Sequence, residues 1–176
     1  MILLADALKA AALLFLAVVV QATIVGSIHV LRGTPDLVLV VLLVIALLRG
    51  SIFGAIAGFW AGFLLDTAYL GTLGVSSLLL TLAGYWIGRY GETTARDRFH
   101  APYTSVGVVT VLYAFGALAL RFVLGSPSPA GDVTAGLPAA VLLNLLLTLP
   151  VYALVRRLFP PQSSADRVHD VRLLAR

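Results

Sequence analysis

The sequence predicts an all-α integral membrane protein in which six transmembrane helices form one bundle over residues 1–160, followed by a short basic tail at 161–176. Composition is the first reason, because 60% of the residues are hydrophobic and 11% are charged, against roughly 25% charged residues in soluble domains. The mean hydropathy of +1.03 agrees. The second reason is that the apolar residues fall into long segments separated by arginine, proline and glycine.

Six spans are expected, at residues 10–28, 36–48, 51–65, 73–90, 103–124 and 137–159. The first and the last three approach the ~20 residues that a spanning helix requires. The first is longer than the apolar core of a signal peptide, so we interpret it as a retained anchor. The second and third are short, which local bilayer thinning or shielding by neighbouring helices can accommodate.

Arg49 separates the second and third segments. A single tilted span over both would place this arginine near the membrane centre, at a cost of at least about 2.5 kcal/mol. The sequence therefore predicts two antiparallel crossings that turn at Arg49 and Gly50, on the cytoplasmic side.

The basic residues set the expected orientation, because cytoplasmic loops are enriched in lysine and arginine. Six spans with both termini cytoplasmic leave Arg32 and Arg121 as the basic residues outside. The cytoplasmic set is Lys9, Arg49, Arg89, Arg96, Arg98, Arg156, Arg157, Arg167, Arg172 and Arg176. The tail then either lies on the anionic inner leaflet or is solvated.

Several function classes are excluded by composition. The chain has no cysteine, and therefore no disulfide framework, thiolate nucleophile or cysteine zinc site. His29, His100 and His169 show no metal-ligand spacing. The net charge of +4 comes from loops and tail rather than from a basic stripe with interleaved aromatics, so no nucleic-acid partner is expected. No cofactor or metal is expected either.

Glycines recur every four residues in the third segment, GSIFGAIAGFWAGFLLD, and a shorter pair follows in the fourth. Lipid provides little hydrophobic drive for helix association, so small residues that allow close backbone approach favour it. The row serves either packing within the bundle or docking of a partner's transmembrane helix, and spacing does not separate the two. Its members are Gly50, Gly54, Gly58, Gly62, Gly84 and Gly88.

A polar cluster is expected at the outer face. Thr34, Pro35 and Asp36 look like an N-cap, a first helical residue and a first-turn acid. Asp66 ends the third segment, where the helix dipole disfavours an acid. Three roles are open for it: accepting from backbone N–H groups of a turn containing Gly71 and Gly74, pairing with Arg32 or Arg121, or recognising a ligand or partner. The full cluster is Arg32, Asp36, Asp66 and Arg121.

Other polar residues lie inside the spans or between them. Gln21, Asn144 and Thr148 are expected to form interhelical hydrogen bonds; the alternative is that they line a pocket. Pro150 is expected to bend the last helix. Residues 125–136, GSPSPAGDVTAG, are expected to form a flexible outer loop. An acid–base role for the carboxylates is disfavoured, because no nucleophile, metal set or phosphate loop accompanies them.

The order of these features resembles the MreD family of bacterial rod shape-determining proteins over roughly residues 15–157. The resemblance rests on TPDLVLVVLLVIALLRG, the glycine-rich span ending in LLDTAYLGTLG, a fourth span ending in GYWIGR, and LLNLLLTLPVY in the last span. The motif positions are Gln21, Pro35, Asp36, Asp66, Gly71, Gly74, Asn144 and Pro150.

That resemblance implies a non-enzymatic inner-membrane component of the cell-elongation machinery. Its partners would be membrane lipids, the single-span protein MreC and, indirectly, MreB and the peptidoglycan synthases; self-association stays open. The six-span size is also similar to the substrate-binding subunits of energy-coupling-factor transporters. This alternative implies a vitamin-type ligand in an outward pocket near Asp36, Asp66 and Arg121.

Overall fold

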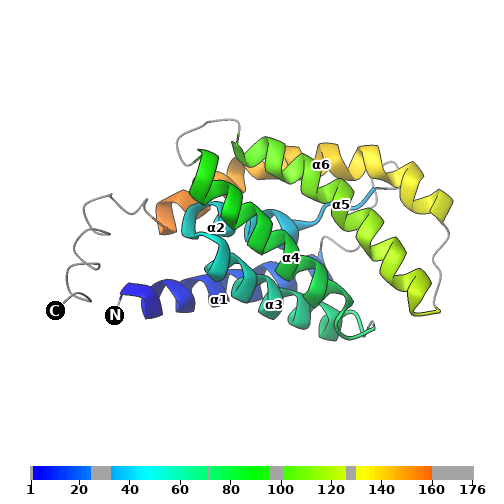
Figure 1. The fold of residues 1–176 in the computed structure, drawn as a ribbon, viewed down its shortest axis with the longest axis horizontal. Helices are drawn as coiled ribbons and strands as arrows, with labels where there is room; N and C mark the ends of the chain where they lie inside the picture. Colours follow the sequence, from blue (N-terminus) through cyan, green and yellow to red (C-terminus); the bar gives the residue numbers. More distant parts are fainter. Residues whose placement is uncertain (1, 25–32, 71, 96–100, 126–129, 160–176) are drawn as a thin grey trace.

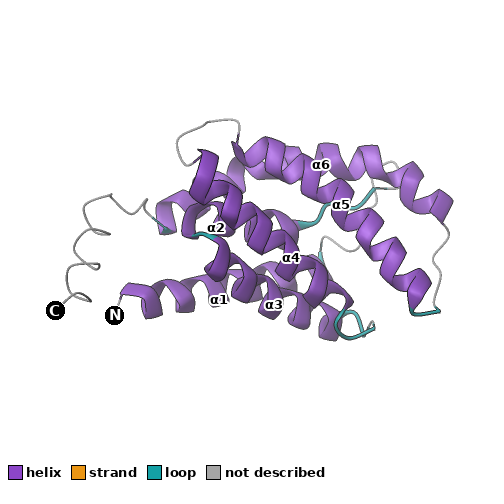
Figure 2. Cartoon of the chain, in the orientation of Figure 1, coloured by secondary structure: helices purple, strands orange, loops and turns teal. Residues whose placement is uncertain are grey.

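The computed structural model describes residues 2–24, 33–70, 72–95, 101–125 and 130–159, and the fold they form is helical (Figures 1 and 2). The helices are α1 (Ile2–Thr23), α2 (Leu37–Arg49), α3 (Ser51–Ala68), α4 (Val75–Tyr90), α5 (Ala101–Val123) and α6 (Ala130–Leu158). A π-helical turn, η2 (Gly91–Ala95), extends α4. The predicted all-α class is confirmed.

Four of these helices are long and apolar enough to cross a membrane: Leu4–Thr23 in α1, Ser51–Ala68, Pro102–Val123 in α5 and Val133–Leu158 in α6. The chain is therefore a multi-pass membrane protein. Helix α2 is apolar but shorter, with 13 residues, about 20 Å at the α-helical rise. That is less than the ~30 Å hydrocarbon core of a bilayer.

Shielding compensates for the short length of α2. Every residue from Val38 to Leu47 is buried, because α1, α3, α4, α5 and α6 all pack against this helix. A helix that is apolar on all sides is stable only when it is surrounded, and the uninterrupted LVLVVLLVIALL sequence matches that position. Helix α2 is thus the centre of the core.

Two expected boundaries are wrong. Helix α1 begins at Ile2, well before residue 10, and residues 25–28 of that expected span lie outside the described residues. Helix α6 begins at Ala130, so residues 130–136 are helical and not part of a loop. Their glycines and polar residues favoured a loop, but adding turns to an existing long helix costs little because helix propagation is cooperative.

The glycine row of α3 is filled by α4. A Cβ atom on Gly54 would clash with the backbone of Gly84, one on Gly58 with the carbonyl of Leu80, and one on Gly62 with the backbone of Ser77. The structure thus places a helix of the same chain against these glycines, the first of the two roles left open by the sequence. Gly88 likewise meets the backbone of Gly50 and Ser51.

The bundle has two chemically different ends. Figure 1 shows the start of α1 and the end of α6 at the same end, where Asp6 and Arg49 also meet; we call it the Arg49 end. Asp36 and Asp66 line a shared cavity at the other end. Helices α2 and α3 are therefore antiparallel, as predicted.

Candidate functional site

Side chains from two helices hold the start of α2. The amide of Gln21 in α1 donates to the carbonyl of Pro35 (3.1 Å) and accepts from the N–H of Leu37 (2.7 Å). The Oδ1 of Asn144 in α6 accepts from the N–H of Asp36 (2.7 Å). Both residues therefore tie α2 to a neighbouring helix, as the sequence predicts.

Asn144 also reaches α5, because its Nδ2 donates to the hydroxyl of Thr110 at 3.1 Å. The prediction for Thr148 is wrong: its hydroxyl donates to the carbonyl of Asn144 in its own helix, 2.7 Å away. A threonine can satisfy its hydroxyl on the preceding turn without any neighbour. Helix α6 continues through Pro150.

Asp36 is the N-cap of α2, and Thr34 is not, which corrects the expected register. The carboxylate of Asp36 accepts a hydrogen bond from the N–H of Leu39 at 3.0 Å. The helix begins at Leu37, which leaves the carbonyl of Pro35 outside it and available to Gln21.

Asp66, at the end of α3, caps the start of α4. Its buried carboxylate accepts from the N–H groups of Gly74 (2.8 Å), Ser76 (3.2 Å) and Ser77 (3.5 Å). The expected closure of a local turn is confirmed at Gly74, whose φ of +100° favours glycine. Gly71 and Arg32 lie outside the described residues.

The two acids meet in a cavity formed by two adjoining hollows of about 590 and 460 Å³, which we call the Asp36/Asp66 cavity. Both hollows share Gln21, Thr34, Asp36, Tyr113 and Arg121; the larger adds Asp66, Tyr69, Thr72 and Ser76, and the smaller adds Asn144. Residues that the sequence singled out in five separate segments thus line one space.

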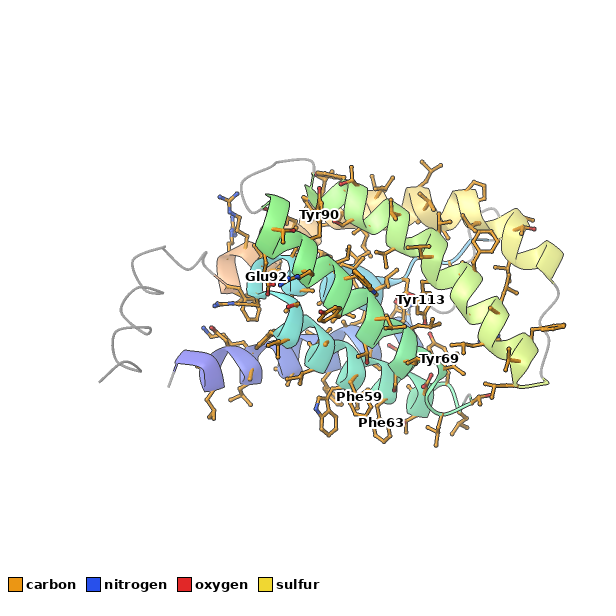
Figure 3. All side chains as sticks on the ribbon, in the orientation of Figure 1. Phe59, Phe63, Tyr69, Tyr90, Glu92 and Tyr113 are labelled. Atoms are coloured by element: carbon orange, nitrogen blue, oxygen red, sulfur yellow. The ribbon has the colours of Figure 1, made fainter. Side chains whose placement is uncertain are left out.

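Two tyrosines of this cavity were not predicted. The hydroxyl of Tyr69 donates to the carbonyl of Gln21 (3.2 Å), and that of Tyr113 donates to the hydroxyl of Ser76 (3.5 Å). Figure 3 shows both at the end of the bundle away from Glu92. The sequence signals that could have indicated them are a tyrosine three residues after Asp66 and a tyrosine inside an apolar span. Burial, then the charge of Asp36, raises the pKa of Tyr69.

The cavity is suited to binding. Asp36 and Asp66, which serve as helix caps, lie on its wall, and carboxylate oxygens accept hydrogen bonds from cationic or N–H donors. Arg121 contributes a positive group on the wall. Among the described residues, no group of three or more His, Asp or Glu side chains could hold a metal ion.

The Arg49 end holds a second polar cluster. Arg49 pairs with Asp6 at 2.9 Å, and its guanidinium lies 5.2 Å from the ring centroid of Phe159. The expected turn is confirmed at Gly50, whose φ is +97°, but the arginine beside it is buried. Asp6 was not predicted from the sequence, although an acidic residue within an apolar first helix could have indicated it.

Glu92 in η2 caps α3 at the same end. Its carboxylate accepts from the N–H of Ser51 (2.8 Å) and from the hydroxyl of Ser51 (3.0 Å). Arg89 lies 3.6 Å away. The hydrogen bond from the N–H of Ser51 is the main cause that lowers the pKa of Glu92.

The fold and the polar clusters define a helical multi-pass membrane protein whose polar groups mostly serve to fix helix ends and to line a cavity. The family model described as rod shape-determining protein MreD matches residues 6–159, and the chain belongs to this family. The family is non-enzymatic and acts in rod-shape determination. No curated protein and no solved structure matches the chain.

Proposed function

We propose that this chain is an inner-membrane scaffold of the bacterial cell-elongation machinery. It binds an MreC-like single-span protein and, through it, helps MreB and the peptidoglycan synthases to organise lateral wall synthesis. Family membership supports a role in rod shape, and the surface between α1 and α3 supports the binding of a transmembrane helix.

A groove of about 400 Å³ between α1 and α3 carries this proposal. Its walls combine small side chains with large apolar ones: Ala7, Ala10, Ala11, Leu14, Phe53, Ile56, Ala57, Trp60, Ala61 and Leu64. Small residues let a second helix approach closely in lipid. The glycine row is already covered by α4, so this groove offers a partner helix another surface of α3 with small residues.

An aromatic ridge flanks the groove. Trp60 packs edge-to-face on Phe59 and Phe63, with ring centroids 6.1 and 6.3 Å apart, and all three side chains are at least 43% exposed. Figure 3 shows Phe59 and Phe63 pointing away from the bundle. Rigid aromatic side chains provide large contact areas at low entropic cost.

The proposed orientation places both termini in the cytoplasm. Lys9, Arg49, Arg89 and Arg156 belong to the Arg49 end, and the positive-inside bias favours that end for the cytoplasm. The Asp36/Asp66 cavity then opens outward and receives the membrane-proximal part of the partner.

The test is copurification of an MreC-like partner with groove variants. Ala11→Leu fills the groove from an exposed position of α1, and recovery of the partner is expected to fall strongly. Ala12→Leu makes the same change at the next exposed residue, outside the groove, and should keep full recovery. Equal recovery with both variants, at normal membrane insertion, would contradict the proposal.

A second candidate is the vitamin-type substrate-binding subunit of an energy-coupling-factor transporter. The volume of the Asp36/Asp66 cavity, about 590 Å³ in its larger part, favours it, because small-molecule sites span roughly 300–1,000 Å³. Native mass spectrometry of the purified protein tests it. A bound small molecule, together with a copurifying ATPase module, would support transport; an empty cavity and an MreC-like partner would support the scaffold.

A further inference from the structure

Another groove lies at the Arg49 end between α5 and α6, separate from the Asp36/Asp66 cavity and from the groove between α1 and α3. It has a volume of about 460 Å³ and is lined by Tyr103 of α5 and by Leu149, Tyr152, Ala153, Arg156 and Arg157 of α6. We call it the Arg156/Arg157 groove. Sequence reasoning treated these two arginines as topology signals, and the proposed scaffold does not use them.

The residues of α6 in this groove follow the pattern of an amphiphile. They recur at intervals of four positions along α6, with Leu149, Ala153 and Arg157 in one row and Tyr152 and Arg156 in the row beside it. Together they form one stripe on the helix surface. The apolar members lie toward the middle of the helix, and the two arginines lie in its last turn. Along the groove the wall therefore changes from apolar, through phenolic, to cationic.

We propose that the Arg156/Arg157 groove binds the headgroup of an anionic phospholipid. The guanidinium groups present paired N–H donors that match phosphate oxygens, and phenol hydroxyls can donate further hydrogen bonds. Leu149 and Ala153 receive the glycerol and the upper part of an acyl chain.

Charge complementarity identifies the occupant. Arg156 and Arg157 give the groove two exposed positive charges, and basic pockets between helices at the cytoplasmic face are typical lipid-headgroup sites. Cations in a last turn also interact favourably with the helix dipole, but that role requires neither the groove nor the two tyrosines. This inference rests on the membrane setting and on the proposed orientation, and not on the partner proposed above.

The test compares phosphatidylglycerol with phosphatidylcholine, titrated into the purified full chain in neutral detergent and followed by native mass spectrometry. The wild-type protein should prefer phosphatidylglycerol. Arg157→Gln should weaken the apparent affinity for it about fivefold, the size expected for one cation near a lipid phosphate. Arg156→Gln/Arg157→Gln should abolish the preference.

Arg89→Gln is the matched control, because it removes the same charge from the same end at a side chain that is 60% exposed and outside the groove. It should keep the preference, and Arg156→Lys/Arg157→Lys should keep most of it. Three results would overturn the proposal: equal binding of both lipids, an equal loss in Arg89→Gln, or equal thermal stabilisation by inorganic phosphate without lipid, which would indicate a soluble anion instead.

Discussion

Asp6 in α1 and Arg49 at the end of α2 form an ion pair of 2.9 Å whose side chains are only 6% and 8% exposed. The pair fixes the first helix to the turn between α2 and α3. It also explains how an arginine is tolerated between two apolar helices: the chain neutralises it with a carboxylate and covers it with the ring of Phe159.

Removing one member of this pair should destabilise the bundle strongly. Asp6→Asn leaves the charge of Arg49 buried without its counterion, and such changes cost about 3–5 kcal/mol in soluble proteins. The midpoint of thermal unfolding in detergent should fall accordingly. Asp6→Leu/Arg49→Met, which removes both charges, should be less destabilising than Asp6→Asn alone. If the loss in this double variant equals the sum of the losses in Asp6→Leu and Arg49→Met, the two residues do not interact directly.

The glycine row predicts a strict size limit between α3 and α4. Gly58→Ala adds a Cβ atom against the carbonyl of Leu80, and overpacking of this kind costs about 1–3 kcal/mol. Gly131→Ala is the matched control, because a Cβ there meets nothing within 4 Å. We expect a lower unfolding midpoint for Gly58→Ala and an unchanged or slightly higher one for Gly131→Ala.

Asp66 should contribute stability through the start of α4. Asp66→Ala leaves the N–H groups of Gly74, Ser76 and Ser77 without their acceptor, a loss of about 1–3 kcal/mol. Asp66→Asn keeps one side-chain carbonyl and should be intermediate. Hydrogen exchange of the first turn of α4 checks this: exchange as slow in Asp66→Ala as in the wild type would exclude the capping role.

Much of this arrangement follows from local sequence signals. The break at Gly50 returns α3 antiparallel to α2, which predicted that Asp36 and Asp66 share one end, and Gln21 and Asn144 were identified as polar residues that needed interhelical partners. The rest depends on contacts between distant residues. Asp6 meets Arg49, and Tyr113 meets Ser76, only because of how the helices pack, and no periodicity within one segment encodes that packing.

The register errors have a similar cause. Thr34-Pro35-Asp36 fits two capping registers by local rules. The hydrogen bonds that the N–H of Leu37 donates to Gln21 and the N–H of Asp36 donates to Asn144 select the register that begins at Leu37. The turn-like residues before Leu137 are helical because α6 extends past its apolar segment.

The last prediction concerns pH. The N–H of Ser51 lowers the pKa of Glu92 below its ordinary value of 4.5, so the folded state binds fewer protons than the unfolded state in that range. The stability that Glu92 contributes is therefore fully present above pH 4.5 and is lost as the pH falls through the lowered pKa. The difference in unfolding midpoint between wild type and Glu92→Gln should shrink over this window. Midpoints of the wild type and Glu92→Gln, measured between about pH 3 and pH 7, check this slope, and a difference that is constant with pH would contradict the role of Glu92 as the cap of α3.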